Sequence, residues 1–125
     1  MSQATDSPMI DLRRDLDYQT GGIVSRILLK QPTGSVTAFA FDAGQELSEH
    51  TCPYEALLDV VEGVGVITVG GTPHTVATGQ LIRLPARVPH AVKAPQRFKM
   101  LLTMLRSNGE AAAAPLKKGD RHPRV

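Results

Sequence analysis

Short apolar runs recur along the chain at spacings of roughly ten residues, and Gly or Pro lies at nearly every junction between them. The runs are rich in β-branched and aliphatic residues, and none is a convincing amphipathic helix. This pattern predicts an antiparallel sandwich or barrel of short strands. We expect strands over residues 23–30, 35–42, 55–62, 64–69, 72–76, 80–84, 90–93 and 97–105.

The predicted strand over residues 35–42 is apolar on both faces. Phe39 and Phe41 fall on one face, whereas Val36, Ala38 and Ala40 fall on the other. A strand that is apolar on both sides needs a second layer outside the barrel interior. We therefore expect this strand to form a subunit contact.

The last predicted strand, 97–105, carries one charged residue in its middle. Lys99 is expected to face solvent or the rim of the barrel, which assigns the alternate positions to the interior. The residues expected to line the interior are Phe98, Met100, Leu102 and Met104.

The chain is long enough for one domain. Its 125 residues are 42% hydrophobic and 21% charged, as in an ordinary soluble globule. We divide it into an N-terminal arm (1–21), a barrel (22–105) and a polar C-terminal tail (106–125). The sequence shows no secretory signal and no apolar run of membrane-spanning length, so we expect a cytoplasmic protein. The single cysteine, Cys52, excludes an internal disulfide.

The basic character of the chain, with a pI near 8.9, belongs to its tail. Residues 106–125 hold five basic and two acidic side chains, whereas the remaining residues hold nine basic and ten acidic ones. No basic residues alternate with aromatic ones, as a surface that stacks bases would require. We therefore expect neither a nucleic-acid partner nor a membrane partner.

Two histidines lie at corresponding ends of two strand runs, and the residues around them follow a known spacing. Gly44, His50, Cys52, Ala56 and Gly63 match the frame Gly-x5-His-x-His-x3-Glu-x6-Gly without a gap.

The second histidine has a frame of its own. Gly79, Pro85 and His90 match Gly-x5-Pro-x-Gly-x2-His-x3-Asn, with Arg87 at the glycine position and Ala94 at the asparagine position. These two frames resemble the two motifs of the cupin superfamily, and the similarity covers roughly residues 22–105.

The resemblance implies an all-β, antiparallel jelly-roll barrel, also called a double-stranded β-helix, with its site inside the barrel. Metal-binding cupins typically use two His and a Glu from the first motif and the His of the second. This chain has His50, Cys52, Ala56 and His90 at those four positions. Two imidazoles and one thiol could hold a divalent transition metal such as Zn, Fe, Cu, Mn or Ni. Glu55 could replace the lost carboxylate only if a bulge turned it inward.

Three functions are compatible with these residues. The chain could bind a small polar or carboxylate-bearing molecule, which Arg87 at the barrel mouth could help to receive. It could instead be a metal-dependent oxygenase or isomerase that uses His50, Cys52 and His90, or a metal-free sugar or small-molecule isomerase or epimerase with a His as base.

In each case we expect a homodimer, and we expect His74 to be a surface or edge residue. The predicted pocket consists of His50, Cys52, Ala56, Arg87, His90, Phe98, Met100, Leu102 and Met104.

Overall fold

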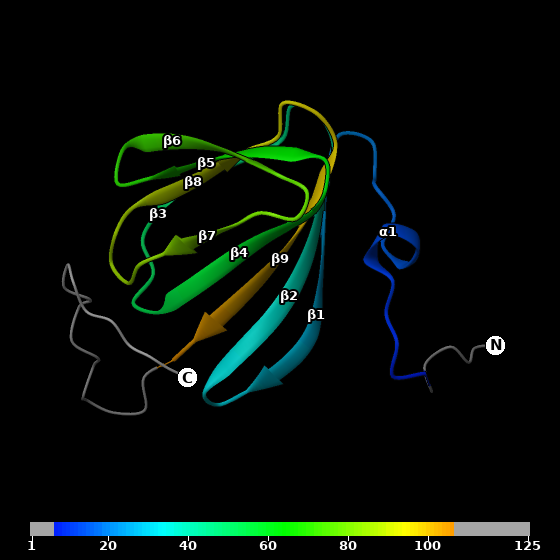
Figure 1. Cartoon of the computed structure of the whole chain (residues 1–125), viewed down its shortest axis with the longest axis horizontal. Coiled ribbons are helices and arrows are strands. Elements are labelled where there is room, and N and C mark those ends of the chain that lie inside the picture. The colour runs from blue at the N-terminus through cyan, green and yellow to red at the C-terminus, as the bar shows by residue number, and fades with distance from the viewer. Residues whose placement is uncertain (1–6, 107–125) are drawn as a thin grey trace.

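The computed structural model describes residues 7–106, which form two antiparallel sheets that face each other (Figure 1). One sheet has the strand order β1-β2-β9-β4-β7, and the other has the order β3-β8-β5-β6. The elements are α1 (Leu12–Asp15), β1 (Ile23–Gln31), β2 (Gly34–Phe41), β3 (Glu46–His50), β4 (Glu55–Glu62), β5 (Val64–Val69), β6 (Thr72–Ala77), β7 (Leu81–Leu84), β8 (His90–Lys93) and β9 (Phe98–Leu105).

The predicted all-β jelly roll is confirmed, with small differences at the ends of the strands. The segment that ends at His50 is not among the strands expected from the sequence, yet it forms β3. Gly70 and Gly71 have positive φ angles and join β5 to β6, as the Gly-Gly pair predicts for a tight hairpin. The predicted tail, apart from Arg106, lies outside the described residues. No helix within residues 7–106 has the length and apolarity needed to cross a membrane.

The core fills the space between the inner faces of the two sheets. Phe41 and Phe98 stack with their ring centroids 4.8 Å apart, and both rings are fully buried. All four residues of β9 that we expected to face the interior belong to this core or pack against it. Phe98 and Met100 are completely enclosed, so they fill the core, whereas Leu102 and Met104 are only partly buried.

The outer face of β2 is covered by the N-terminal arm of the same chain. Ala38 and Ala40 are fully buried beneath Leu16, and Leu12 and Tyr18 pack around them. Our expectation of a subunit contact on this face is therefore wrong for Ala38 and Ala40. The two-sided apolar pattern correctly required a second layer, but the chain itself provides that layer.

Lys99 is buried, which corrects our expectation that it faces solvent. Its side chain does point away from the core, but the arm covers that face and leaves the residue only 3% exposed. The Lys99 ammonium donates to the carbonyls of Leu12 and Arg13 at 2.9 and 3.0 Å, and it lies 4.9 Å from the centre of the Tyr18 ring. A single helical turn leaves its carbonyls without partners, and Lys99 satisfies two of them.

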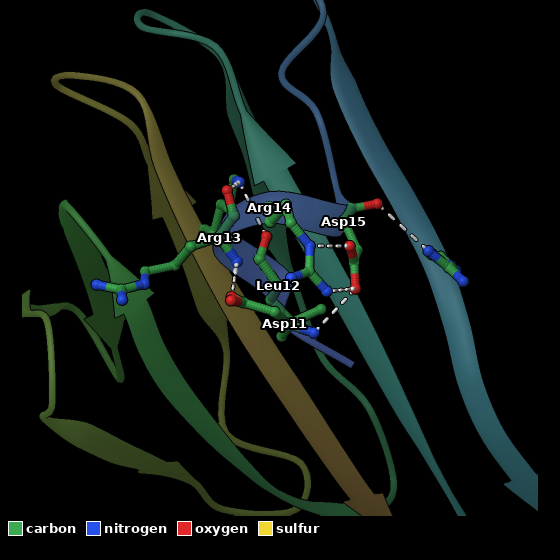
Figure 2. A network of polar contacts seen from close by, with 7 residues as sticks. Asp11, Leu12, Arg13, Arg14 and Asp15 are labelled. Carbon is green, nitrogen blue, oxygen red and sulfur yellow. Dashed lines mark hydrogen bonds and ion pairs between the residues drawn. The ribbon is translucent and has the colours of Figure 1, made fainter. Parts of the chain in front are cut away.

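The turn that Lys99 holds is organised by its own acidic residues (Figure 2). The Asp11 side chain accepts a hydrogen bond from the backbone N–H of Arg13 at 3.1 Å, as an N-cap residue does. Asp15 accepts from the Asp11 N–H at 3.0 Å and pairs with the Arg14 guanidinium at 2.8 Å. A helix of four residues is too short to be stable alone, so the cap and the contact with Lys99 together keep the arm in place.

Replacing Lys99 with Met should loosen the arm, because the partly buried carbonyls of Leu12 and Arg13 would both lose their donor. We expect the free energy of unfolding to fall by about 1–3 kcal/mol and trypsin to cleave faster after Arg13 and Arg14. Chemical denaturation and limited proteolysis measure both effects. The matched control is Lys93→Met at an exposed position of β8. Equal stability and equal cleavage rates for the two variants would contradict this role for Lys99.

Candidate functional site

His50 and His90 lie directly opposite each other on the neighbouring strands β3 and β8. Their ring centroids are 4.3 Å apart and their planes are inclined at 70°. The pairing depends on an irregularity in β3. Leu47 pairs with Val92, so a regular ladder would place Glu49 opposite His90, but the register shifts between Leu47 and His50. The extra residue is a β-bulge, and it replaces a carboxylate with an imidazole beside His90.

Both imidazoles are oriented by the backbone. Nδ1 of His50 donates to the Ser48 carbonyl at 2.8 Å, and Nδ1 of His90 donates to the Val88 carbonyl at 3.3 Å. A carbonyl can only accept, so these contacts place the proton of each neutral ring on Nδ1. Nε2 of each ring remains an acceptor, and no hydrogen bond to either Nε2 is found among residues 7–106. Backbone carbonyls carry no residue signature, and sequence reasoning therefore missed these two orienting groups.

The two imidazoles differ in their surroundings. His90 is only 8% exposed, whereas His50 is exposed on the edge strand β3. Burial lowers the pKa of His90 below its usual 6.5, and the neighbouring His50 ring lowers the pKa further. His90 is therefore neutral at pH 7, with Nε2 available as a hydrogen-bond acceptor or as a base.

Cys52 and Ala56 take different places in the barrel wall. The Cys52 thiol lies 3.8 Å from the sulfur of Met104, and the Cys52 carbonyl accepts the Arg87 N–H at 2.7 Å. Ala56 is 8% exposed and pairs with Leu84 and Met104, so a methyl group stands at the position where the cupin motif has a carboxylate.

Glu55 points away from the barrel interior. Its carboxylate accepts the Ala86 N–H and the Arg83 guanidinium, each at 3.0 Å. These two donors hold the pKa of Glu55 below its usual range. The irregularity in the pairing of β4 with β9 lies between Val60 and Glu62, so no bulge after Pro53 turns Glu55 inward.

The donor set for a metal is therefore incomplete in the described part of the chain. No group of three or more His, Cys, Asp or Glu side chains among residues 7–106 lies close enough to hold one ion. The two histidines meet, but Cys52 does not join them in a three-ligand group, and Glu55 is engaged elsewhere. The residues present do not fit the ligand set that the cupin motif implies.

Arg87 is the one residue other than glycine with a positive φ angle, 66°, among those that the structure describes. It occupies the position where the family motif has a glycine. The left-handed conformation costs an L-residue about 1–2 kcal/mol. The Arg87 backbone N–H bridges to Cys52, so this strained residue ties the loop before His90 to the loop after His50. Its side chain is exposed, and no ion pair of Arg87 is found within residues 7–106.

His74 is exposed on the edge strand β6, as expected, and does not join the other two histidines. It does line a cleft of about 640 Å³ that neither His50 nor His90 lines. The paired imidazoles are the candidate functional site in spite of this cleft, because ring nitrogens with a fixed orientation are groups that can act on a ligand.

Residues 38–104 match the family described as the cupin domain. The chain belongs to the cupin family. Among solved structures, it resembles a conserved SPY1581 protein of unknown function from Streptococcus pyogenes, with a TM-score of 0.77 and 31% identity over 82% of this chain and 90% of that one.

It also resembles a cupin 2 conserved barrel domain protein from Leptotrichia buccalis, with a TM-score of 0.75 and 38% identity over 78% of this chain and 47% of that one.

A more distant structural neighbour is an enzyme. The salicylate 1,2-dioxygenase from Pseudoaminobacter salicylatoxidans has a TM-score of 0.63 and 19% identity, over 66% of this chain and 25% of that one. At this identity the likeness shows the fold alone. Comparison with curated proteins found no match.

The lowered pKa of His90 can be measured directly. We expect the ring protons of His90 to titrate in NMR spectra with a midpoint below 6.5 and the midpoint to rise in His50→Gln, which removes the neighbouring ring. Because the folded state binds this proton more weakly than the unfolded chain, stability should decrease as the pH falls below about 6.5. A midpoint at or above 6.5 in the unaltered protein would show that the ring is not buried as described.

Proposed function

We propose that this cupin binds a small polar molecule bearing a carboxylate at the His50–His90 pair. The observation that carries the proposal is the facing arrangement of the two rings, whose centroids are 4.3 Å apart and whose Nδ1 atoms are held by backbone carbonyls. This arrangement leaves two Nε2 atoms to contact a ligand. Their orientation is set before the ligand arrives, which reduces the entropy lost on binding.

A carboxylate would change the protonation of the pair. The neutral rings offer only acceptors at Nε2, whereas a carboxylate needs donors, so binding requires at least one ring to gain a proton. The negative charge of the ligand favours this proton and offsets the repulsion between the two rings. Binding should therefore take up a proton and become tighter as the pH falls from about 8 to about 6.

The rest of the proposed site combines an apolar wall with one cation. Leu102 and Met104, on the inner face of β9, are partly buried and offer contacts for the body of the ligand. Arg87 lies three positions before His90 in the loop that enters β8. A guanidinium binds a carboxylate through two parallel hydrogen bonds, which suits it for a second contact with the same group.

Loss of the ring nitrogens should abolish carboxylate binding. With benzoate as the probe and benzamide as its neutral counterpart, we expect calorimetry to detect benzoate, and its affinity to fall about tenfold or more in His50→Gln and in His90→Gln. Lys93→Gln, at an exposed position of β8, is the control and should bind as the unaltered protein does. Equal affinity for benzoate and benzamide, or an affinity for benzoate that is unchanged in the His50→Gln, His90→Gln double variant, would refute the proposed function.

Arg87 provides a separate test, because its effects on stability and on binding should have opposite signs. Arg87→Gly relieves the strain at φ 66° and should raise the free energy of unfolding by about 1 kcal/mol. The same change should weaken benzoate binding, since one donor of the site is lost. Arg87→Ala, which keeps the strain but lacks the charge, should weaken binding without the gain in stability. If Arg87→Gly bound benzoate as tightly as the unaltered protein, Arg87 would have no part in the site.

A metal-free isomerase or epimerase is a second candidate, favoured by one observation. The lowered pKa of His90 keeps its Nε2 unprotonated at pH 7, as a general base requires. Such an enzyme should show a pH-rate inflection that His90→Gln removes. The metal-dependent alternative, with Zn, Fe, Cu, Mn or Ni on His50, Cys52 and His90, has less support because the three side chains do not form one ligand group.

We also propose that the protein is a homodimer that pairs through the uncovered half of the outer face of the β1-β2-β9-β4-β7 sheet. The arm covers the end of this face near Lys99, but Leu29 and Leu57 remain 56% and 45% exposed. Val36 and Thr103 join them in one row across the strands. Sedimentation of the Leu29→Lys, Leu57→Lys variant should show a monomer, and an unchanged dimer would place the contact elsewhere.

A further inference from the structure

The cleft of about 640 Å³ lies where the barrel fails to close, along β6 and β7. These strands are consecutive in the chain, but each is the last strand of its own sheet, so they do not pair with each other (Figure 1). Val69, Val76 and Ile82 line the cleft and also pack in or against the core. The floor of the cleft is therefore an uncovered edge of the hydrophobic core, and its volume is that of a small-molecule site.

His74 belongs to the inner face of its sheet although it is exposed. It pairs with Ile67, and Ile82 on the other side of the cleft pairs with Leu58. Ile67 and Leu58 are both fully buried, and directly paired residues share a face of a sheet. The His74 imidazole thus projects from the inner face of β6, and solvent reaches it only because no strand bridges the gap to β7.

The edge of β6 is poorly suited to an added peptide strand. The Ala77 N–H points away from β5 and donates to the side chain of Gln80 at 2.9 Å. Residues two positions apart direct their N–H groups to the same edge of an antiparallel strand, so Pro73 and Thr75 share this edge. Pro73 has no N–H, and only Thr75 can donate to a partner strand. We therefore infer a small molecule as the occupant, not a peptide.

The ionisable residues at the rim indicate which kind of small molecule the cleft would bind. Among the described residues that line the cleft, Arg83 and His74 are ionisable and none is acidic. Arg83 pairs with Leu57 and therefore leaves β7 on the outer face, where its Nε donates to Glu55 at 3.0 Å. Its two terminal nitrogens have no hydrogen-bond partner among residues 7–106. An apolar floor below a basic rim is complementary to an amphipathic anion.

We propose that the cleft between β6 and β7 binds a small amphipathic anion, separately from the site at His50 and His90. Its apolar body would lie on Val69, Val76 and Ile82. Its carboxylate, sulfonate or phosphate group would lie at the rim of the cleft, where it could contact His74 and Arg83. The molecule would cover the part of the core that the barrel leaves open, so its binding should also stabilise the fold.

The fluorescent probe anilinonaphthalene sulfonate has this chemistry and tests the proposal on the full chain. We expect saturable binding at a single site, weakened about tenfold in the His74→Gln, Arg83→Gln variant through the loss of charge-assisted hydrogen bonds. Glu55→Gln is the matched control, because it breaks the same Arg83–Glu55 pair but keeps the cation. The Glu55→Gln variant should bind the probe as tightly as the unaltered protein or more tightly. His50→Gln should bind the probe as the unaltered protein does.

NMR on the unaltered protein locates the bound anion without any substitution, with decanesulfonate as a second ligand. Addition of decanesulfonate should shift the methyl signals of Val69, Val76 and Ile82 and leave the ring signals of His50 unchanged. The neutral 1-decanol should bind more weakly than decanesulfonate. The proposal is overturned if the probe does not bind, if the His74→Gln, Arg83→Gln variant binds it as tightly as the Glu55→Gln control, or if the largest shifts occur at His50 and His90.

Discussion

The bulge in β3 is the constraint on which the candidate site depends. One extra residue between Leu47 and His50 places an imidazole, in place of the Glu49 carboxylate, opposite His90. A carboxylate there would favour protonation of the neighbouring ring. An imidazole instead adds to the effect of burial and keeps His90 neutral. The register of the β3–β8 pair thus determines which group lies opposite His90. Glu49 there would form an ion pair with the protonated ring, whereas His50 leaves two imidazole Nε2 atoms free to contact a ligand.

The two sheets contribute differently to holding this site in place. The core covers the inner face of the sheet that contains β9, and the arm covers the part of its outer face near Lys99. Lys99 joins the arm to this sheet through two carbonyls and the Tyr18 ring. The smaller sheet carries both histidines and ends at β6, where no strand continues to β7. The open edge exposes core residues and creates the cleft.

Much of the fold could be predicted from local patterns, because strand alternation and turn residues act over a few positions. Alternation along β9 correctly assigned Met100 and Leu102 to the interior, and the motif spacing brought His50 and His90 into correspondence. Burial of Lys99 could not be predicted, since it depends on an arm more than 80 positions away along the chain. The partners of Glu55 lie 28 and 31 positions away along the chain, and the cleft at His74 exists because the consecutive strands β6 and β7 belong to different sheets. Residue types alone reveal neither feature.

In the cupin motif of this chain, the residues that form the turns are retained, whereas some of the residues at the ligand positions are replaced. Gly44, Gly63 and Gly79 keep positive φ angles, so the turns that build the barrel are retained. At the ligand positions, Ala56 is a methyl in the wall and Cys52 contacts Met104, so the donor set has changed while the scaffold has not. Arg87 stands at the glycine position of the motif with a positive φ angle and adds a cation. These exchanges support a site that recognises a ligand through imidazole and guanidinium groups.

Titration with Co²⁺ tests most directly whether the site is a pair of imidazoles without a third ligand. A cobalt ion bound by a thiolate has an intense charge-transfer absorption, which two imidazoles alone do not produce. We expect the unaltered protein to show no such band and to bind Co²⁺ no more tightly than Cys52→Ala does. A stoichiometric charge-transfer band that disappears in Cys52→Ala, together with a loss of affinity, would contradict the account and identify a three-ligand metal centre.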